Sequence, residues 1–242
     1  MLMTTSALVL HTTRYGDSSL IVHLFTQQAG MVNGVIRRSA TRRSKRGGAH
    51  LLQPMAWVDV VLDVRSSRSL AYMREVTSHK AYLHVPFDPL RTSVALFLAE
   101  FLNHVLSGEN ENRPLFSFLY EAMQWFDSQK RGIANFHLVF LFRLSLFLGI
   151  RPLTDDYQDG QYFDMQESRF VDVLPPHPNV LPAAETAQFH RLLRMRFETM
   201  HLFAFSSAER NRCVELLLRY YRLHVPTLPE LKSLPILQEL FR

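Results

Sequence analysis

The sequence predicts an α+β, multi-domain protein in which a small five-stranded β-barrel (residues 1–83) precedes an all-α helical domain (residues 84–242). Stretches rich in branched and aromatic residues fill positions 5–78, whereas helical periodicity begins after Pro86. The segment Pro86-Phe87-Asp88-Pro89 fits a boundary, because the residue before a proline disfavours helix. At 242 residues the chain is long enough to bury two hydrophobic cores.

Five short stretches of the N-terminal part are expected to be β-strands, at residues 7–11, 20–25, 31–36, 54–64 and 70–78. In the fourth stretch, Val58, Val60 and Leu62 alternate with Trp57 and Asp59. One face of this strand should therefore be buried and the other should contact water. Five strands in so short a segment favour a closed barrel such as the OB-fold, because closure removes exposed sheet edges.

The second domain is expected to contain six helices, at residues 90–106, 114–126, 135–148, 184–196, 207–223 and 234–240. Gly108 and Gly149 follow the first and third of them, where C-terminal caps belong. The third helix is apolar on nearly all sides, so its neighbours must surround it. Between the third and fourth helices, residues 154–182 should form an irregular insertion with a hairpin built from residues 162–164 and 169–173.

The positive charge of the chain is concentrated at one end. Residues 1–83 contain 11 Lys/Arg and 4 Asp/Glu, whereas residues 84–242 contain 16 and 18. Only four of the 27 basic residues are lysines, and the planar guanidinium of arginine suits pairing with phosphate. This asymmetry indicates a localised positive field, which favours a polyanionic partner such as nucleic acid.

The loop after the third strand is the strongest local signal. Residues 37–46 contain six basic residues and no acidic one, so this loop can neutralise a phosphate backbone. The predicted nucleic-acid contacts are the basic residues of this loop and of neighbouring strand ends: Arg14, Arg37, Arg38, Arg42, Arg43, Lys45, Arg46, Arg65, Arg68 and Arg74. Stacking on unpaired bases is considered for Tyr15, Phe25, Trp57 and Tyr72, although aromatic residues in strands are more often core.

Catalytic and metal-binding patterns do not emerge from the sequence. It contains neither a phosphate-binding glycine loop nor a Gly-x-Ser-x-Gly elbow, and its eleven histidines never form His-x-x-x-His. Asp155, Asp159 and Gly160 resemble the start of a calcium loop, but Tyr157 and Gln166 stand where carboxylate ligands are required. We therefore expect a non-catalytic protein with no catalytic residue, no cofactor and no metal.

Cysteine content and hydropathy indicate the cellular compartment in which the protein works. The single cysteine, Cys213, cannot form an internal disulfide, and we expect it to be buried in a protein of the reducing cytoplasm. The N-terminus lacks the features of a secretion signal. The longest apolar stretch, residues 136–150, is too short to span a bilayer, so no membrane partner is expected.

Four segments in order resemble the RecO family of bacterial DNA repair and recombination mediators. Residues 7–22 are similar to the opening hairpin of the family, which reads x-V-L-x-x-x-x-Y-G-E-S-D-x-I, and Thr26 and Gly30 follow in step. Leu52-Gln53-Pro54 matches its entry to the fourth strand. Further matches are Phe140 to Leu144 with Leu148-Gly149, and then Leu218 to Tyr221 with Leu231-Lys232-Ser233. The resemblance spans nearly the whole chain.

This resemblance implies an OB-fold that binds single- and double-stranded DNA and anneals complementary strands. It also implies action with RecR to help RecA replace single-strand-binding protein, and a nucleoid-associated place in the bacterial cytoplasm. Some family members hold the acidic C-terminal tail of single-strand-binding protein in a helical-domain pocket, for which Arg143 is a loose candidate. Many members carry a four-cysteine zinc site after the central helix. Residues 154–182 contain no cysteine, so the insertion is expected to be zinc-free.

Two other functions stay open at this point. The first is an RNA- or translation-associated OB-fold protein, which competition between single-stranded DNA and RNA would distinguish. The second is a metal-dependent hydrolase that uses the acidic segment Asp155–Glu167, which degradation of DNA with magnesium or manganese would reveal.

Overall fold

The computed structural model describes residues 1–37, 49–64, 70–153 and 157–240. The chain forms two compact units. The first comprises residues 1–128 and 230–237, and the second comprises residues 129–229 together with those from Gln238 onward. The first unit thus adds to the barrel the two helices that follow it and the start of the helix at Leu234–Leu240. The boundary predicted at residue 84 separates domains that fold independently. The division into compact units does not test independent folding, so this boundary stays a prediction.

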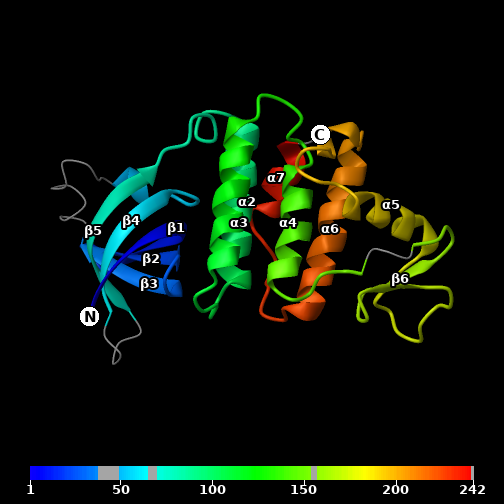
Figure 1. The fold of residues 1–242 in the computed structure, drawn as a ribbon, viewed down its shortest axis with the longest axis horizontal. Coiled ribbons are helices and arrows are strands. Elements are labelled where there is room, and N and C mark those ends of the chain that lie inside the picture. The colour runs from blue at the N-terminus through cyan, green and yellow to red at the C-terminus, as the bar shows by residue number, and fades with distance from the viewer. Residues whose placement is uncertain (38–48, 65–69, 154–156, 241–242) are drawn as a thin grey trace. The chain divides into compact units, whose positions relative to one another are not determined.

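Five strands of the first unit form a closed barrel, as the sequence predicted (Figure 1). They are β1 (Leu2–Tyr15), β2 (Ser19–Thr26), β3 (Gly30–Arg37), β4 (Trp57–Asp63) and β5 (Ala71–Lys80). Their order around the barrel is β1-β2-β3-β5-β4, and β3 runs parallel to β5 while the other neighbours are antiparallel. The long β1 pairs with β4 through its first half and with β2 through its second half. This is the OB-like arrangement of a five-stranded barrel.

Side chains that alternate along the strands fill the barrel interior. Val58, Val60 and Leu62 of β4 are buried as predicted, together with Val22 and Leu24 of β2. Trp57 departs from the prediction, which placed it on the face exposed to water. It is 1% exposed, because Phe116 and Tyr120 of α3 (Arg113–Ser128) pack against its indole ring. Sequence periodicity cannot show that a distant helix covers the outer face of a strand.

A carboxylate joins the barrel to the helices of its unit. The chain leaves β5 and enters α2 (Pro89–Val105), where the side chain of Asp88 caps the first turn by accepting from the Arg91 N–H. Asp127, near the end of α3, accepts backbone N–H bonds from Leu83, His84 and Val85 at 2.7 to 2.8 Å. Burial opposes its charge, but these donors outweigh burial and hold the pKa of Asp127 below its usual value. The linker is therefore fixed by the charged carboxylate.

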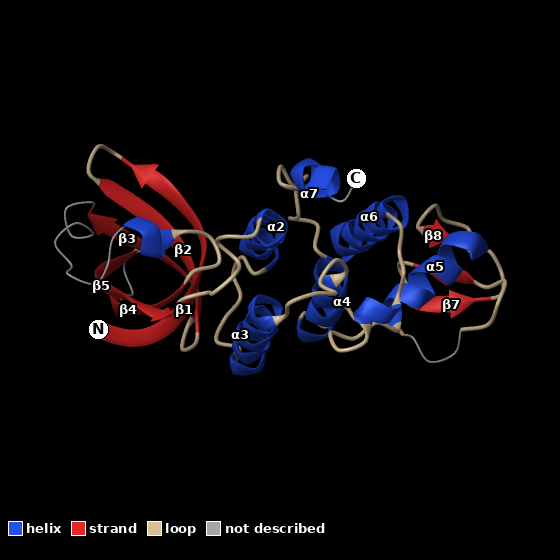
Figure 2. Ribbon diagram, turned by 90° about the horizontal axis from the view of Figure 1, so that it is seen from above, coloured by secondary structure: helices blue, strands red, loops and turns tan. Residues whose placement is uncertain are grey.

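The second unit is built around α4 (Phe136–Phe147), α5 (Ala183–Leu193) and α6 (Ser207–His224), coloured blue in Figure 2. Residues 136–142 of α4 are all buried, which confirms that the third predicted helix is surrounded. Ser206 and Glu209 form a capping box at the start of α6. The buried hydroxyl of Tyr221 donates to the Leu141 carbonyl oxygen at 2.7 Å and so ties α6 to α4.

Helix ends depart from the prediction most clearly at α5. This helix ends at Leu193 rather than at residue 196, because the Met195 N–H turns back to the Leu192 carbonyl oxygen. The turn buries the Met195 side chain, and a 3-10 segment follows at Met200–Leu202. Gly108 and Gly149 have φ of +83° and +71°, so both adopt the left-handed conformation expected of C-terminal caps. The short helix α7 (Leu234–Leu240) has the predicted bounds.

The insertion after α4 contains the predicted hairpin, formed by β6 (Tyr162–Asp164) and β7 (Arg169–Val171). A third strand, β8 (Val180–Leu181), pairs with the other edge of β6 and was not predicted, because two residues give no periodic pattern. Phe163 is fully buried and lies 4.9 Å from Phe189 of α5 between ring centroids. The cysteine-free insertion is therefore held by aromatic packing.

Candidate nucleic-acid interface

Three predicted contact residues fall within the described part of the chain. Arg14 stands near the end of β1, and Arg37 is the last residue of β3. Both are exposed, and both strands border β2 at the same end, because Arg14 pairs with Leu20 and Arg37 pairs with Ser19. The structure thus brings these two arginines to one end of the barrel. The predicted contacts that lie outside the described residues are Arg38, Arg42, Arg43, Lys45, Arg46, Arg65 and Arg68.

Arg74 has a different setting. It lies on β5, where the register with β4 shifts, and its guanidinium lies 2.8 Å from the Asp63 carboxylate. The N-terminal amine is 3.7 Å from the same carboxylate. Arg74 therefore neutralises an acid at the barrel surface, whereas Arg14 and Arg37 have no ion pair to any described residue. This difference makes Arg74 the weaker candidate for a direct phosphate contact.

The four aromatic candidates divide into two pairs. Phe25 and Trp57 are 0% and 1% exposed, and both pack against Phe116 of α3. They belong to the core, so they are not available for stacking. Tyr15 and Tyr72 are 54% and 40% exposed. Sequence alone cannot separate the pairs, because their burial depends on where α3 packs.

The topology of the barrel also bears on nucleic-acid binding. OB-fold barrels bind oligonucleotides across the face of strands 2 and 3 and through the loops that join strands 1 to 2 and 4 to 5. Arg14 and Tyr15 adjoin the first of these loops, Arg37 ends β3, and Tyr72 lies just after the start of β5. Tyr15, Arg37 and Tyr72 thus lie next to the strands and loops that this fold commonly uses.

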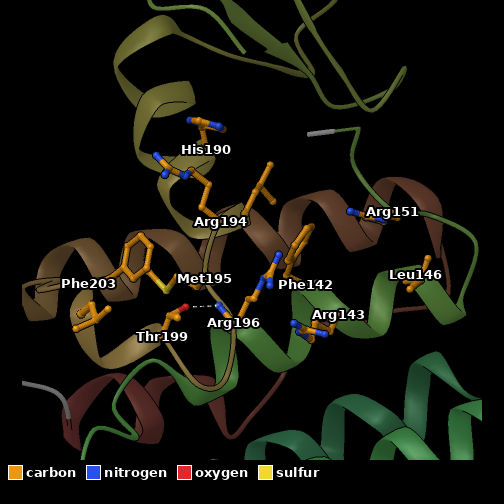
Figure 3. Close-up of a pocket in the computed structure, with 12 residues that line it drawn as sticks. Phe142, Arg143, Leu146, Arg151, His190, Arg194, Met195, Arg196, Thr199 and Phe203 are labelled. Atoms are coloured by element: carbon orange, nitrogen blue, oxygen red, sulfur yellow. Dashed lines mark hydrogen bonds between the residues drawn. The ribbon is translucent and has the colours of Figure 1, made fainter. Parts of the chain in front are cut away.

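The second unit holds a pocket of about 1020 Å³, and Arg143, the loose candidate taken from the family resemblance, is one of its lining residues. The pocket is formed by α4, α5 and the turns that follow α5, and Figure 3 shows the labelled side chains around it. Its apolar wall includes Phe142, Leu193 and Met195, and all three side chains are buried. Its volume is at the upper end of the range for small-ligand sites, so it can hold several peptide residues.

Four arginines line this pocket, and we call it the arginine pocket: Arg143, Arg151, Arg194 and Arg196. No described lining residue is acidic. The guanidinium of Arg143 lies over the Phe197 ring, 5.6 Å from its centroid. His190 also lines the pocket, and burial together with Arg194 lowers its pKa. Apolar walls beside cations of one sign favour an anionic ligand that also has apolar groups.

The sequence contains a partial indication of the arginine pocket. Arg191, Arg194 and Arg196 cluster around the end of the fourth predicted helix. Basic residues at a helix C-terminus are common, however, because they complement the helix dipole. Only the early end of α5 turns Arg194 and Arg196 toward the residues of α4.

Two further features of the described residues concern metals and membranes. Across residues 1–37, 49–64, 70–153 and 157–240, no three His, Cys, Asp or Glu residues are grouped so that they could hold a metal ion. Asp155 and Asp156 of the acidic segment lie outside this part. Within the same ranges, no helix has the length and apolar character that a membrane crossing requires.

Comparison with known proteins relates the whole chain to a single family. Residues 1–82 match the family model for the N-terminal part of Recombination protein O, and residues 86–235 match the model for its C-terminal part. Proteins named DNA repair protein RecO from Phocaeicola vulgatus and Bacteroides fragilis are each 43% identical, over 241 and 244 residues. A protein of the same name from Porphyromonas gingivalis is 35% identical over 248 residues. Each alignment covers 100% of this chain and of the relative.

Proposed function

This chain belongs to the Recombination protein O (RecO) family and has a role in DNA repair and recombination, and from that premise we propose that it is a non-catalytic, DNA-binding recombination mediator. It binds single- and double-stranded DNA through the barrel and anneals complementary strands. With RecR, it helps to load RecA on strands covered by single-strand-binding protein, so its contact with RecA is indirect. It works in the bacterial cytoplasm, associated with the nucleoid.

The observation that supports DNA binding best is the concentration of basic residues on the barrel. Eleven Lys/Arg against four Asp/Glu lie in residues 1–83, and one of these acids, Asp63, is already neutralised by Arg74. Arg14 and Arg37 are exposed at one end of the barrel, and Arg37 begins the basic segment of residues 37–46. Neutralisation of phosphates by such groups releases counterions, which gives an affinity that is independent of base sequence.

The arginine pocket supports a second part of the proposal, which is that this unit receives the acidic C-terminal tail of single-strand-binding protein. Arg143, Arg194 and Arg196 offer charge-assisted hydrogen bonds to carboxylates. The wall formed by Phe142 and Met195 offers an apolar contact to the same chain end. Contact through a tail would bring the mediator to covered strands without competition for the DNA itself.

DNA binding is tested by removal of the loop charges. Replacement of Arg42, Arg43, Lys45 and Arg46 with alanine should weaken binding to single-stranded and duplex DNA and should flatten the dependence of affinity on salt. Each lost phosphate contact should change the slope of log affinity against log salt by roughly 0.7 to 0.9. A count-matched control replaces four exposed basic residues elsewhere, Lys130, Arg131, Arg222 and Lys232. An unaltered salt slope in the loop variant would contradict the proposed interface.

A strand-annealing assay separates a mediator from a generic DNA-binding protein. The wild-type protein should accelerate annealing of complementary oligonucleotides both when they are bare and when they are coated with single-strand-binding protein. Acceleration on bare strands alone would remove the mediator role. Competition with RNA of equal length tests the RNA-associated alternative, because RNA that competes better than DNA would reverse the assignment.

A further inference from the structure

Two exposed tyrosines lie on one face of the barrel because of the strand register. Tyr15 of β1 is opposite Ser19 of β2, which is opposite Arg37 of β3. Two residues back along β1, the neighbouring row on the same face contains one residue from each of β1, β2, β3 and β5: Thr13, Ile21, Val35 and Tyr72. Residues paired in this way point to the same face of a sheet. Tyr15, Arg37 and Tyr72 therefore share the outer face, which we call the tyrosine face.

Burial of the alternate residues confirms this orientation. Val22, Ile36, Ala71 and Met73 neighbour the rows just described, and all are between 0% and 6% exposed in the barrel core. Tyr72 alternates with such residues along β5, and β3 and β4 pair with β5 on either side of it. Tyr15 lies at the end of β1, where only β2 pairs with the strand, and both tyrosines are exposed. A preorganised ring is suited to stacking, because little rotational freedom remains to be lost on binding.

The helices of the same unit approach a different part of the outer surface. His23, one row beyond Ile21 along β2, lies 2.8 Å from Asn103 of α2 between Nδ1 and Oδ1. His11 of β1 is opposite His23, and their ring centroids are 5.5 Å apart. Helix α2 thus meets the sheet at the row of His11 and His23. The rows of Tyr15 and Tyr72 lie on the side of that row nearer the β1–β2 turn.

Charge on the tyrosine face favours an anion. Arg37 shares a row with Tyr15, and its strand β3 lies between β1 and β5, which carry the two tyrosines. The acid nearest in register to Tyr72 is Asp63, its partner on β4. Asp63 is neutralised by Arg74 and by the N-terminal amine. Phosphates can therefore approach Tyr72 without meeting a free carboxylate there.

The spacing of the rings fits an unpaired strand better than a duplex. Along the path through β2 and β3, three strand-to-strand steps separate β1 from β5, which is roughly 14 Å along the curved surface of the barrel. Stacked bases in a duplex are about 3.4 Å apart and have both faces covered by neighbours. Two rings that are so far apart can each accept the free face of a separate unpaired base, with Arg37 on a phosphate between them.

We propose that Tyr15 and Tyr72 stack on unpaired bases of a strand that crosses the tyrosine face, and that this stacking adds an affinity for unpaired strands that a duplex does not gain. The inference rests on the proposed DNA-binding function and adds a base-contacting part to it. The loop charges act on any phosphate backbone, whereas the two rings act only where bases are free.

An abasic strand provides the test, because it retains the phosphates and lacks the bases. Three labelled probes of about 20 nucleotides per strand are compared by fluorescence anisotropy at one salt concentration: oligo(dT), an abasic strand of equal length, and a duplex. The wild-type protein should bind oligo(dT) at least roughly tenfold more tightly than the abasic strand. The double variant Tyr15→Ala/Tyr72→Ala should bind these two probes within about twofold of each other. Its affinity for the abasic strand and the duplex should equal that of the wild type.

Two control variants keep the result interpretable. Tyr15→Phe/Tyr72→Phe retains both rings and should retain the preference, which excludes a role of the hydroxyl groups. Phe87→Ala removes a ring of the same unit that is 81% exposed and lies outside the tyrosine face, and it should leave the preference unchanged. Equal binding of oligo(dT) and the abasic strand by the wild type would overturn the stacking proposal while DNA binding stands. Failure of the wild type to bind any probe would overturn the proposed function as well.

Discussion

The tyrosine face of the barrel and the arginine pocket of the second unit both present arginine to a ligand, but they present it differently. On the barrel, exposed side chains follow rows that run across neighbouring strands on its outer surface. In the pocket, four arginines surround a hollow with buried apolar residues in its wall. An extended polyanion can lie along the first, whereas a chain end can enter the second. Positive charge thus predicts an anionic ligand in both places, and only shape predicts which kind.

The sharpest test of this comparison is to measure how a variant of the arginine pocket binds each of the two ligands. The charge-reversed variant Arg143→Glu/Arg194→Glu should bind a labelled peptide of the single-strand-binding protein tail at least roughly a hundredfold more weakly, because repulsion replaces two charge-assisted contacts. Its affinity for oligo(dT) should change by less than about twofold. Peptide and DNA are both titrated by anisotropy. If the variant lost DNA binding to the same extent, the two regions would share one ligand.

The next largest effect is expected at Asp127, whose carboxylate connects the helices of the first unit to the segment that follows the barrel. Asp127→Asn removes the charge that all three backbone N–H groups of residues 83–85 bond to, and it replaces one acceptor oxygen by an NH2 donor. At least one N–H therefore loses its acceptor, and the free energy of unfolding should fall by about 2–3 kcal/mol. Chemical denaturation measures this change. Glu121→Gln, an exposed residue of the same helix, is the control and should have almost no effect. A loss below about 0.5 kcal/mol would show that the carboxylate is not what holds the linker.

Acid should destabilise the second unit through His137. Burial and Arg210 lower the pKa of His137 to about 3, so the folded chain keeps it neutral. The unfolded chain takes up a proton below its ordinary pKa of about 6.5, and stability is therefore lost as pH falls from there toward the folded pKa. Between about pH 7 and pH 5 this group alone should lower the free energy of unfolding by about 2 kcal/mol. In His137→Gln, the slope of stability against pH should be smaller, and an unchanged slope would contradict this origin.

The smallest effect is expected at Arg74. Arg74→Ala should weaken binding of single-stranded DNA by about twofold, because it leaves the Asp63 carboxylate less neutralised beside Tyr72. The double variant Arg74→Ala/Asp63→Ala should restore the wild-type affinity. If Arg74 instead contacts phosphate directly, the double variant would bind as weakly as the single one. Anisotropy titrations at low salt, where surface charges are least screened, resolve the difference.

The sequence by itself determined the order of strands and helices, the closed barrel, the hairpin of the insertion and the location of the excess charge. These follow from local patterns: alternation in β4, the all-round apolar surface of α4 and the glycines that cap α2 and α4. Periodicity and capping depend on neighbours within a few residues, so one chain is enough to show them.

Only the tertiary structure decided which of these residues are available to a ligand. It buried Trp57 and Phe25 beneath α3 and left Tyr15 and Tyr72 exposed, although all four stood as equal candidates. It paired Arg74 with Asp63, and it placed Arg143 of α4 beside Arg194 and Arg196 in one pocket. The physical reason is the same in each case: burial, pairing and convergence depend on residues far away in the chain, which no local pattern encodes.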